Sequence, residues 1–220
     1  TTWDRLDQAV KHAGMMFEKV VRLQIYGKNH NQEHASDSFN AETWREAGML
    51  ESFYDPAIKP VFDRRDSVRE KKVLRAFKTG KPKIVTNLTK SLSSPFAQGP
   101  RLLQRIRVRF GNTHEVVDIG NQRFHRIYDA LALMERAEVI VSADTATLHL
   151  AAAIEVPLVA LVNDTPWMGS IVRRNSAGTL RYSDASEDRV IQAISAAIAG
   201  KIHTAPVAIA SSTPSASGYR

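Results

Sequence analysis

The most specific chemical pattern in the chain is a polar turn between an apolar run, residues 139–142, and a helical run rich in Ala and Leu. Asp144 and Thr145 open the turn, and the side chain of either one can cap a helix that begins there. The backbone N–H groups of the first turn of such a helix lack partners within the helix, so they favour a phosphate. These groups belong to Ala146, Thr147 and Leu148. The pattern predicts an anion site, although an ordinary capped helix is built from the same residues.

Two side chains of this turn can act on a ligand directly. Asp144 is itself an anion, so we expect it to face a sugar hydroxyl or backbone N–H groups rather than a phosphate. His149, one helical turn further on, can donate to a phosphate or pack on a ring. The alternative interpretation of His149 is a histidine satisfied in the interior.

A second polar turn follows the apolar run 84–88. Lys90 lies there between the hydroxyl groups of Thr89 and Ser91, just after Asn87. In open parallel sheets, ligands bind beyond the carboxyl ends of the strands. A lysine in that place is suited to neutralise the negative charge of a phosphate group. A surface loop rich in Ser, Thr and Lys is the alternative.

A third polar turn, residues 118–122, follows the apolar run 115–119. Its polar groups can meet a nucleotide base or a ribose. All three turns therefore come directly after predicted strands, where a parallel sheet binds its ligands.

These turns need a scaffold of alternating strands and helices, and the sequence supplies one from residue 83 onward. Short β-branched apolar runs alternate there with helical runs, which implies right-handed crossovers and a parallel sheet covered on both faces. The expected strands are 84–88, 115–119, 139–142 and 158–162, and the expected helices are 100–109, 124–137, 147–154 and 187–199. The predicted fold class is α/β: a Rossmann-like parallel sheet with helices on both faces, preceded by a smaller, mainly helical N-terminal segment.

The polar turn at Asp144 and its surroundings resemble a known family. The string DTATLHLAAA at 144–153, followed by Pro157 and an apolar strand, is similar to the carboxyl-domain motif of the heptosyltransferase-like glycosyltransferases, glycosyltransferase family nine with the GT-B fold. The resemblance extends over residues 80–200 and is dense over 127–163. One departure is Ala146, where the family usually has a glycine that brings the backbone closer to the diphosphate.

The resemblance implies a function and a set of site residues. It implies an inverting, metal-independent glycosyltransferase that uses a nucleotide-diphosphate sugar as substrate and no cofactor. It also implies that residues 81–202 are the nucleotide-sugar-binding domain, because in relatives the loop after the first strand of that domain meets the diphosphate. The donor-binding residues expected on this basis are Asn87, Thr89, Lys90, Ser91, Asp144, Thr145, Ala146, Thr147, Leu148 and His149.

No catalytic base is carried over from the family, because the family's base lies on a segment without a counterpart here. Residues 1–80 are too few for a full acceptor domain, so we expect a helical and loop segment that is a remnant or the end of one. Residues 203–220, rich in Ala, Ser, Thr and Pro, are expected to be a flexible tail. By chemistry alone, the candidates for a base are His30, Glu33, His34 and Asp37. The two histidines lack a third ligand, so we expect no metal there.

Charge is concentrated in one part of the chain. Residues 58–110 hold 15 Lys and Arg against three acids, an excess of +12 in a chain of net charge +7. Such a stretch attracts anions, so the alternative function is a non-catalytic protein that binds nucleotides or polyanions, including nucleic acid. A polyanionic acceptor such as a lipopolysaccharide-like glycan fits the same charge. Aromatic residues do not interleave with the basic ones, which disfavours nucleic acid.

Composition excludes several other classes. The 220 residues include no cysteine, which excludes disulfides, cysteine-based zinc sites and a thiol nucleophile. The longest apolar runs are five residues, far too short to cross a membrane. We therefore expect a cytoplasmic location.

Overall fold

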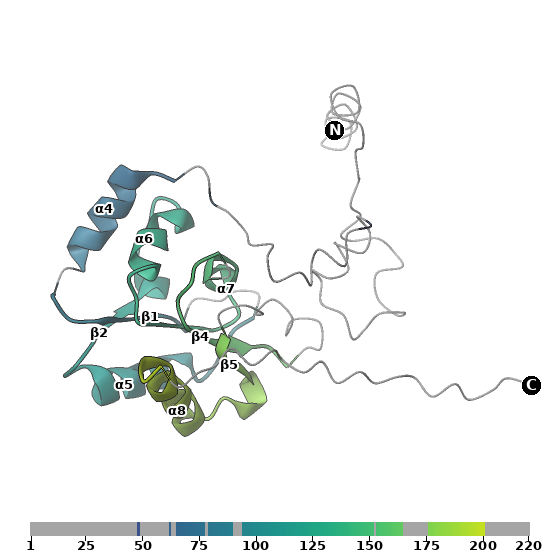
Figure 1. The fold of residues 1–220 in the computed structure, drawn as a ribbon. Coiled ribbons are helices and arrows are strands. Elements are labelled where there is room, and N and C mark those ends of the chain that lie inside the picture. Colours follow the sequence, from purple (N-terminus) through teal and green to yellow (C-terminus); the bar gives the residue numbers. More distant parts are fainter. Residues whose placement is uncertain are drawn as a thin grey trace, which may run out of the picture.

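The computed structural model describes residues 62, 65–77, 79–89, 94–151, 153–164 and 176–200, together with residue 48. Within them the chain forms one five-stranded sheet with helices on both faces (Figure 1). Residues 1–47 of the expected N-terminal segment and the whole of the expected tail at 203–220 lie outside the described residues.

All the strands of the sheet are parallel, and they lie in the order β2-β1-β3-β4-β5. The strands are β1 (Lys83–Asn87), β2 (Glu115–Asp118), β3 (Val139–Ser142), β4 (Leu158–Val162) and β5 (Ser176–Arg181). Every residue of β3 and β4 is buried, because helices cover both faces of the sheet. The predicted α/β class with a parallel, Rossmann-like sheet is confirmed.

The fifth strand, β5, is the one that the sequence pattern did not indicate. Its residues, SAGTLR, include a single large apolar side chain, Leu180. The strand lies at the edge of the sheet and pairs only with β4, with a shift of register between Leu158 and Val159. Residues 177–181 of β5 are half-buried or exposed, so this strand can form without the apolar run that marks a fully buried strand.

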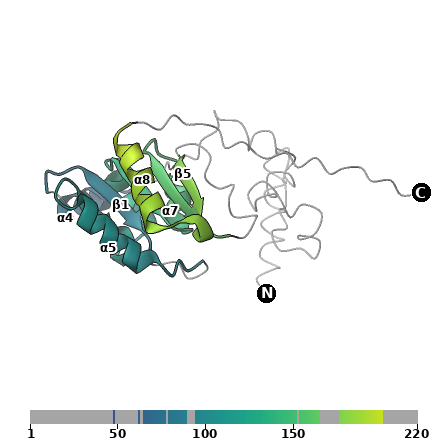
Figure 2. The same ribbon diagram turned by 90° about the horizontal axis from the view of Figure 1, so that it is seen from below.

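The helices form two layers, one on each face of the sheet. They are α4 (Ser67–Ala76), α5 (Gly99–Phe110), α6 (Leu131–Met134), α7 (Ala146–Ala151) and α8 (Glu187–Ile198). Figure 1 shows α4, α6 and α7 on one face, and Figure 2 shows α5 and α8 lying across the other. Two separate apolar clusters correspond to these layers: Leu131 and Leu148 belong to the first, and Ile106 and Ile194 to the second.

The helix expected at 124–137 is shorter in the structure. A 3₁₀ turn, η2 (Ile127–Ala130), leads into the four-residue helix α6. The Asp129 carboxylate accepts from the Arg126 N–H at 3.1 Å, which makes Arg126 the cap and leaves the residues before it outside the helix. The buried side chains of α6 still face the core as the apolar spacing predicted.

Helix α4 is fastened at its beginning by charged side chains. Asp66 caps it by accepting from the N–H groups of Val68 and Arg69. Arg65 donates to Glu70 of α4 at 2.5 and 2.9 Å and to Glu135, just after α6, at 2.5 and 2.9 Å. Helix α4 is therefore tied to the layer that contains α6.

None of the helices in the described part of the chain is long and apolar enough to cross a membrane.

Candidate functional site

The order of the strands defines where a ligand fits. The chain passes from β1 to β2 on one side, and then returns to place β3 on the other side of β1. In sheets of this order, the crevice beyond the carboxyl ends of the two strands at that reversal receives the ligand. Asn87 ends β1, and it pairs in register with Ser142, which ends β3. The candidate site therefore lies around Asn87 and the turn after Ser142.

Asn87 joins the two predicted polar turns. Its Nδ2 donates to the hydroxyl of Thr147 at 2.8 Å and to that of Thr145 at 3.1 Å. Its Oδ1 is buried and accepts no hydrogen bond from the residues that the structure describes. This oxygen lies so close to Gly120 that a Cβ there would approach it to 2.5 Å. Asn87, Thr145, Thr147 and the backbone of Gly120 are thus packed into one unit, as expected for groups at the ends of adjacent parallel strands.

Several polar groups of the turn before α7 form hydrogen bonds with one another. The Thr145 hydroxyl accepts from the Thr147 N–H at 3.2 Å, so Thr145 rather than Asp144 caps the helix, and it also contacts the Ser142 hydroxyl at 3.1 Å. The Leu148 N–H donates to the Thr145 carbonyl at 3.0 Å. Two of the three N–H groups expected to hold a phosphate are therefore bonded within the chain. Ala146, which carries the third, is exposed.

Asp144 lies in a different environment from the hydroxyl groups around Asn87. Only 5% of the residue is exposed. Burial raises the pKa of its carboxyl group above the usual 3.8, an effect that a hydrogen bond from the Ser94 side chain, the charge of His149 and the Asn163 N–H partly offset. The structure thus places Asp144 against backbone and hydroxyl donors, one of the two orientations expected of it.

Tyr182 is a member of the site that the sequence did not reveal. Its hydroxyl accepts from the Asp144 N–H at 3.1 Å and donates to the Ser94 carbonyl at 3.0 Å, and burial raises its pKa. Its ring packs on Phe96, with centroids 4.7 Å apart. Tyr182 directly follows β5. Because β5 was not predicted from the sequence, there was no reason to expect Tyr182 at the end of a strand.

The second and third polar turns meet in the structure. The Asp118 carboxylate accepts from the Gly120 N–H at 3.2 Å and from the Asn121 amide, and Asn121 also donates to the Thr89 hydroxyl at 3.1 Å. Asp118 is buried, whereas Asn121 is exposed. Thr89 is thus brought beside the third turn. Lys90 and Ser91 lie outside the described residues, so their roles stay predictions.

The remaining expectations can be placed in the same way. Leu148 is buried in the core, which gives its side chain a packing role, and His149 is exposed on α7. The candidates for a catalytic base, at 30–37, lie outside the described residues. Among the residues that the structure describes, no three His, Asp or Glu side chains are grouped as metal ligands.

The assembled groups define the chemistry of the site. Amide and hydroxyl groups dominate the ends of β1, β2 and β3, with the carboxylates of Asp118 and Asp144 beside them. Such neutral donors and acceptors suit the hydroxyl groups of a sugar or a ribose. No Lys or Arg side chain of the described residues forms a hydrogen bond within this group, and Lys90, the cation that the sequence places after β1, lies outside them.

The fold and the site define a doubly wound α/β domain. Its polar turns lie at the switch point, the place beside β1 and β3 where the strand order reverses. Residues 125–169 match the family model "Glycosyltransferase family 9 (heptosyltransferase)". The matched segment contains α6, β3, α7 and β4, so the resemblance predicted from the sequence is confirmed over this part of the chain.

Two solved structures are similar to the chain. A glycosyl transferase of family 9 from Veillonella parvula is 12% identical, with a TM-score of 0.53 over 77% of this chain and 62% of that one. The ADP-heptose LPS heptosyltransferase II of E. coli is 15% identical, with a TM-score of 0.45 over 63% of this chain and 53% of that one. The match therefore spans less than two thirds of either relative. No curated protein matches the chain significantly.

Proposed function

We propose that the chain is a glycosyltransferase that moves a sugar from a nucleotide-diphosphate sugar to an acceptor hydroxyl. The family match over residues 125–169 supports sugar transfer as the reaction. The observation that carries the proposal is the pair of hydrogen bonds from Asn87 to Thr145 and Thr147. They join the matched segment to the end of β1 at the switch point, where a nucleotide binds in sheets of this order.

The proposed donor lies along the carboxyl ends of β1 and β3. Thr89 and Asn121 would meet hydroxyl groups of the nucleotide, while the exposed start of α7 at Ala146 and the cation of Lys90 would meet the diphosphate. Asp144 would orient the sugar. The Tyr182 hydroxyl, which bonds to both Asp144 and Ser94, would hold Asp144 in place. A positioned cation stabilises the charge that develops on a departing phosphate.

The reaction proposed is a single displacement at the anomeric carbon. The acceptor oxygen forms a bond to that carbon and loses its proton to a base, while the bond to the phosphate oxygen breaks and its electron pair leaves with the nucleoside diphosphate. One displacement inverts the anomeric configuration. The family resemblance implies that the reaction inverts the configuration and needs no metal. The net charge of +7 would favour an anionic acceptor glycan.

Ligand binding to the purified chain tests the donor site. Thermal unfolding should shift upward with a nucleoside diphosphate or with one of the UDP-, ADP- and GDP-sugars, because a ligand that binds only the folded state stabilises it. If none of these ligands shifts the transition, the donor-site proposal fails.

A substitution of Lys90 tests the charge. Lys90→Ala should weaken diphosphate binding by about 1–3 kcal/mol, the cost of a lost charge-assisted hydrogen bond. Lys72→Ala, which removes an exposed lysine of α4, is the matched control and should leave the affinity unchanged. Equal affinities for the wild-type and Lys90→Ala chains, measured by titration calorimetry, would remove Lys90 from the site.

A further inference from the structure

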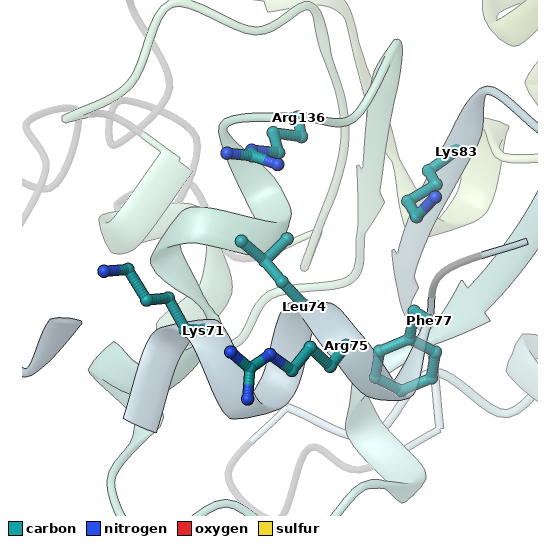
Figure 3. A pocket seen from close by; sticks show the side chains of 6 residues that line it. All are labelled: Lys71, Leu74, Arg75, Phe77, Lys83 and Arg136. Atoms are coloured by element: carbon teal, nitrogen blue, oxygen red, sulfur yellow. The ribbon is translucent and has the colours of Figure 1, made fainter. Parts of the chain in front are cut away.

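A cavity of about 280 Å³ lies at the amino end of the sheet, between α4 and the start of the strands. Six residues line it: Lys71, Leu74, Arg75, Phe77, Lys83 and Arg136. Figure 3 shows the charged ends of Lys71, Arg75 and Arg136 around the side chain of Leu74, with Lys83 and Phe77 on the other side. No acidic residue is among the described residues that line the cavity.

Three of the four cations in this cavity are unpaired. Lys71, Arg75 and Arg136 are exposed, and their side chains make neither a hydrogen bond nor an ion pair with any residue that the structure describes. Lys83 differs, because its Nζ lies 3.2 Å from a Glu115 carboxylate oxygen.

The nearby acids are engaged by other side chains. Arg65 binds both Glu70 and Glu135, and His114 contacts Glu138 at 3.0 Å. The positive charge of Lys71, Arg75 and Arg136 is therefore not neutralised by these neighbours. Like charges held together repel one another, and a bound anion relieves that repulsion.

The floor of the cavity is apolar. Leu74 and Phe77 are half-buried, and both pack against the core cluster that contains Leu131 and Ile140. A ligand that fits both the floor and the cations would combine an anionic group with an apolar portion.

The cavity is separate from the candidate donor site. Lys83 begins β1 and Asn87 ends it, so the two sites lie at opposite ends of this strand, about 13 Å apart at the usual rise per residue. The basic stretch noted in the sequence, 58–110, supplies Lys71, Arg75 and Lys83, while Arg136 joins them from the turn before β3.

We propose that this cavity binds the phosphate group of a ligand whose remaining part is apolar. Two guanidinium groups offer paired N–H donors that match phosphate oxygens, and the ammonium of Lys71 adds a third cation. Leu74 and Phe77 contact the apolar part. The same chemistry is present in a soluble phosphate ester and in an anionic lipid headgroup, and the experiment separates these two sources.

Titration calorimetry with the full chain tests the soluble source. Phenyl phosphate should bind, and more tightly than inorganic phosphate, because its ring can cover Leu74 and Phe77. Arg75→Gln and Arg136→Gln should each weaken phenyl phosphate binding about tenfold, since each removes a charge-assisted pair. The control is Arg107→Gln, which removes an exposed arginine of α5 without a side-chain partner among the described residues and should bind as the wild type does.

Co-sedimentation with vesicles tests the lipid source. Vesicles containing phosphatidylglycerol, but not those of phosphatidylcholine alone, should retain the chain, and Arg75→Gln and Arg136→Gln should release it while Arg107→Gln does not. Dependence on Arg75 and Arg136 in either assay supports the cavity and identifies the source. Binding in neither assay, or an equal loss in Arg107→Gln, overturns the proposal. Because Arg75→Gln should leave affinity for nucleoside diphosphates unchanged, a failure here is distinct from a failure of the donor site.

Discussion

Asn87 is the side chain on which the arrangement of the candidate site depends. It is 8% exposed, its amide joins two hydroxyl groups of another segment, and its oxygen lies against Gly120. An amide at this point keeps the end of β1 and the start of α7 at a fixed separation. In the proposed donor site, Asn87 would act chiefly by holding Thr145 and Thr147 in place.

Asn87→Ala should lower the free energy of unfolding by about 1–3 kcal/mol, because one buried and one partly buried hydrogen bond are lost and two hydroxyl groups lose a donor. It should also weaken nucleotide binding, since the turn before α7 loses its support. Denaturant unfolding and calorimetry measure the two effects. Asn112→Ala, at an exposed turn, should change stability by no more than about 0.5 kcal/mol. An unchanged stability of Asn87→Ala would contradict the role given to this amide.

Asp144 makes stability depend on pH in a direction opposite to that of most carboxylates. Burial raises its pKa, so above the usual value of 3.8 the folded state holds the proton more tightly than the unfolded state does. The contribution of Asp144 to stability therefore falls as the pH rises from 3.8 through the raised pKa. Above the raised pKa, the burial of its charge is a cost.

Asp144→Asn should therefore be more stable than the wild type at neutral pH, and this gain should shrink as the pH approaches 3.8. Asp164 offers the opposite case, because hydrogen bonds from Ser183 lower the pKa of its exposed carboxyl group. Asp164→Asn should lose stability at neutral pH relative to acid pH. Thermal unfolding of the three proteins across this range is the measurement, and the same sign for both variants would contradict the account of Asp144.

The polar side chains of the site were predictable from the sequence, and their partners were not. Asn87, Thr145 and Thr147 became candidates because they lie in or beside the polar turns that follow apolar runs, which is a local pattern. Tyr182 lies 38 residues from Asp144, its hydrogen-bonding partner, and a contact at that distance along the chain leaves no periodic signal. The hydrogen bond from the Thr147 N–H to the Thr145 hydroxyl likewise depends on the rotamer of Thr145, which the amino-acid sequence does not reveal.

At the scale of elements, the attachment of α4 depends on Arg65. Its guanidinium donates to Glu70, whose side chain is 7% exposed, and to the half-exposed Glu135 beyond α6. These partners raise the pKa of Arg65 further above its already high value. The ion pair holds α4 over α6, which also positions the helix that carries Lys71 and Arg75.

Arg65→Ala should lower the free energy of unfolding by about 1–3 kcal/mol, because a nearly buried carboxylate loses its partner. Arg105→Ala removes a comparable pair on the other face, where Arg105 and Asp188 are 55% and 81% exposed, and should cost less than about 1 kcal/mol. Chemical denaturation of both variants makes the comparison. Equal losses would show that the burial of Glu70 does not matter.

Strands and helices were predictable to different degrees. β1, β3 and β4 are buried almost throughout and β2 over its last two residues, so their apolar β-branched runs indicated them within a residue or two. β5, the edge strand beside β4, is half-buried or exposed over residues 177–181, and it escaped detection. The helix before β3 was expected to be longer, because the apolar spacing continues past the point where Asp129 caps the Arg126 N–H.

At the scale of the whole molecule, the described sheet and its two layers contain their own core. The two apolar clusters are built from residues between Phe62 and Ile198, one on each face of the sheet. A chain of residues 62–200 should therefore fold by itself and unfold in one cooperative thermal transition. Calorimetry or circular dichroism measures this. A gradual transition without a heat-capacity peak would show that the core needs residues outside this range.

The order β2-β1-β3-β4-β5 also has a consequence for how the protein is made. During synthesis β1 and β2 emerge first, and a parallel pair of short strands is only marginally stable in water. One edge of β1 stays open until Val139 and the rest of β3 have left the ribosome, because β3 is its other neighbour. Folding is then limited by contacts between distant parts of the chain, which form slowly. Nascent chains that stop before β3 should accordingly expose an apolar strand edge and be held by chaperones.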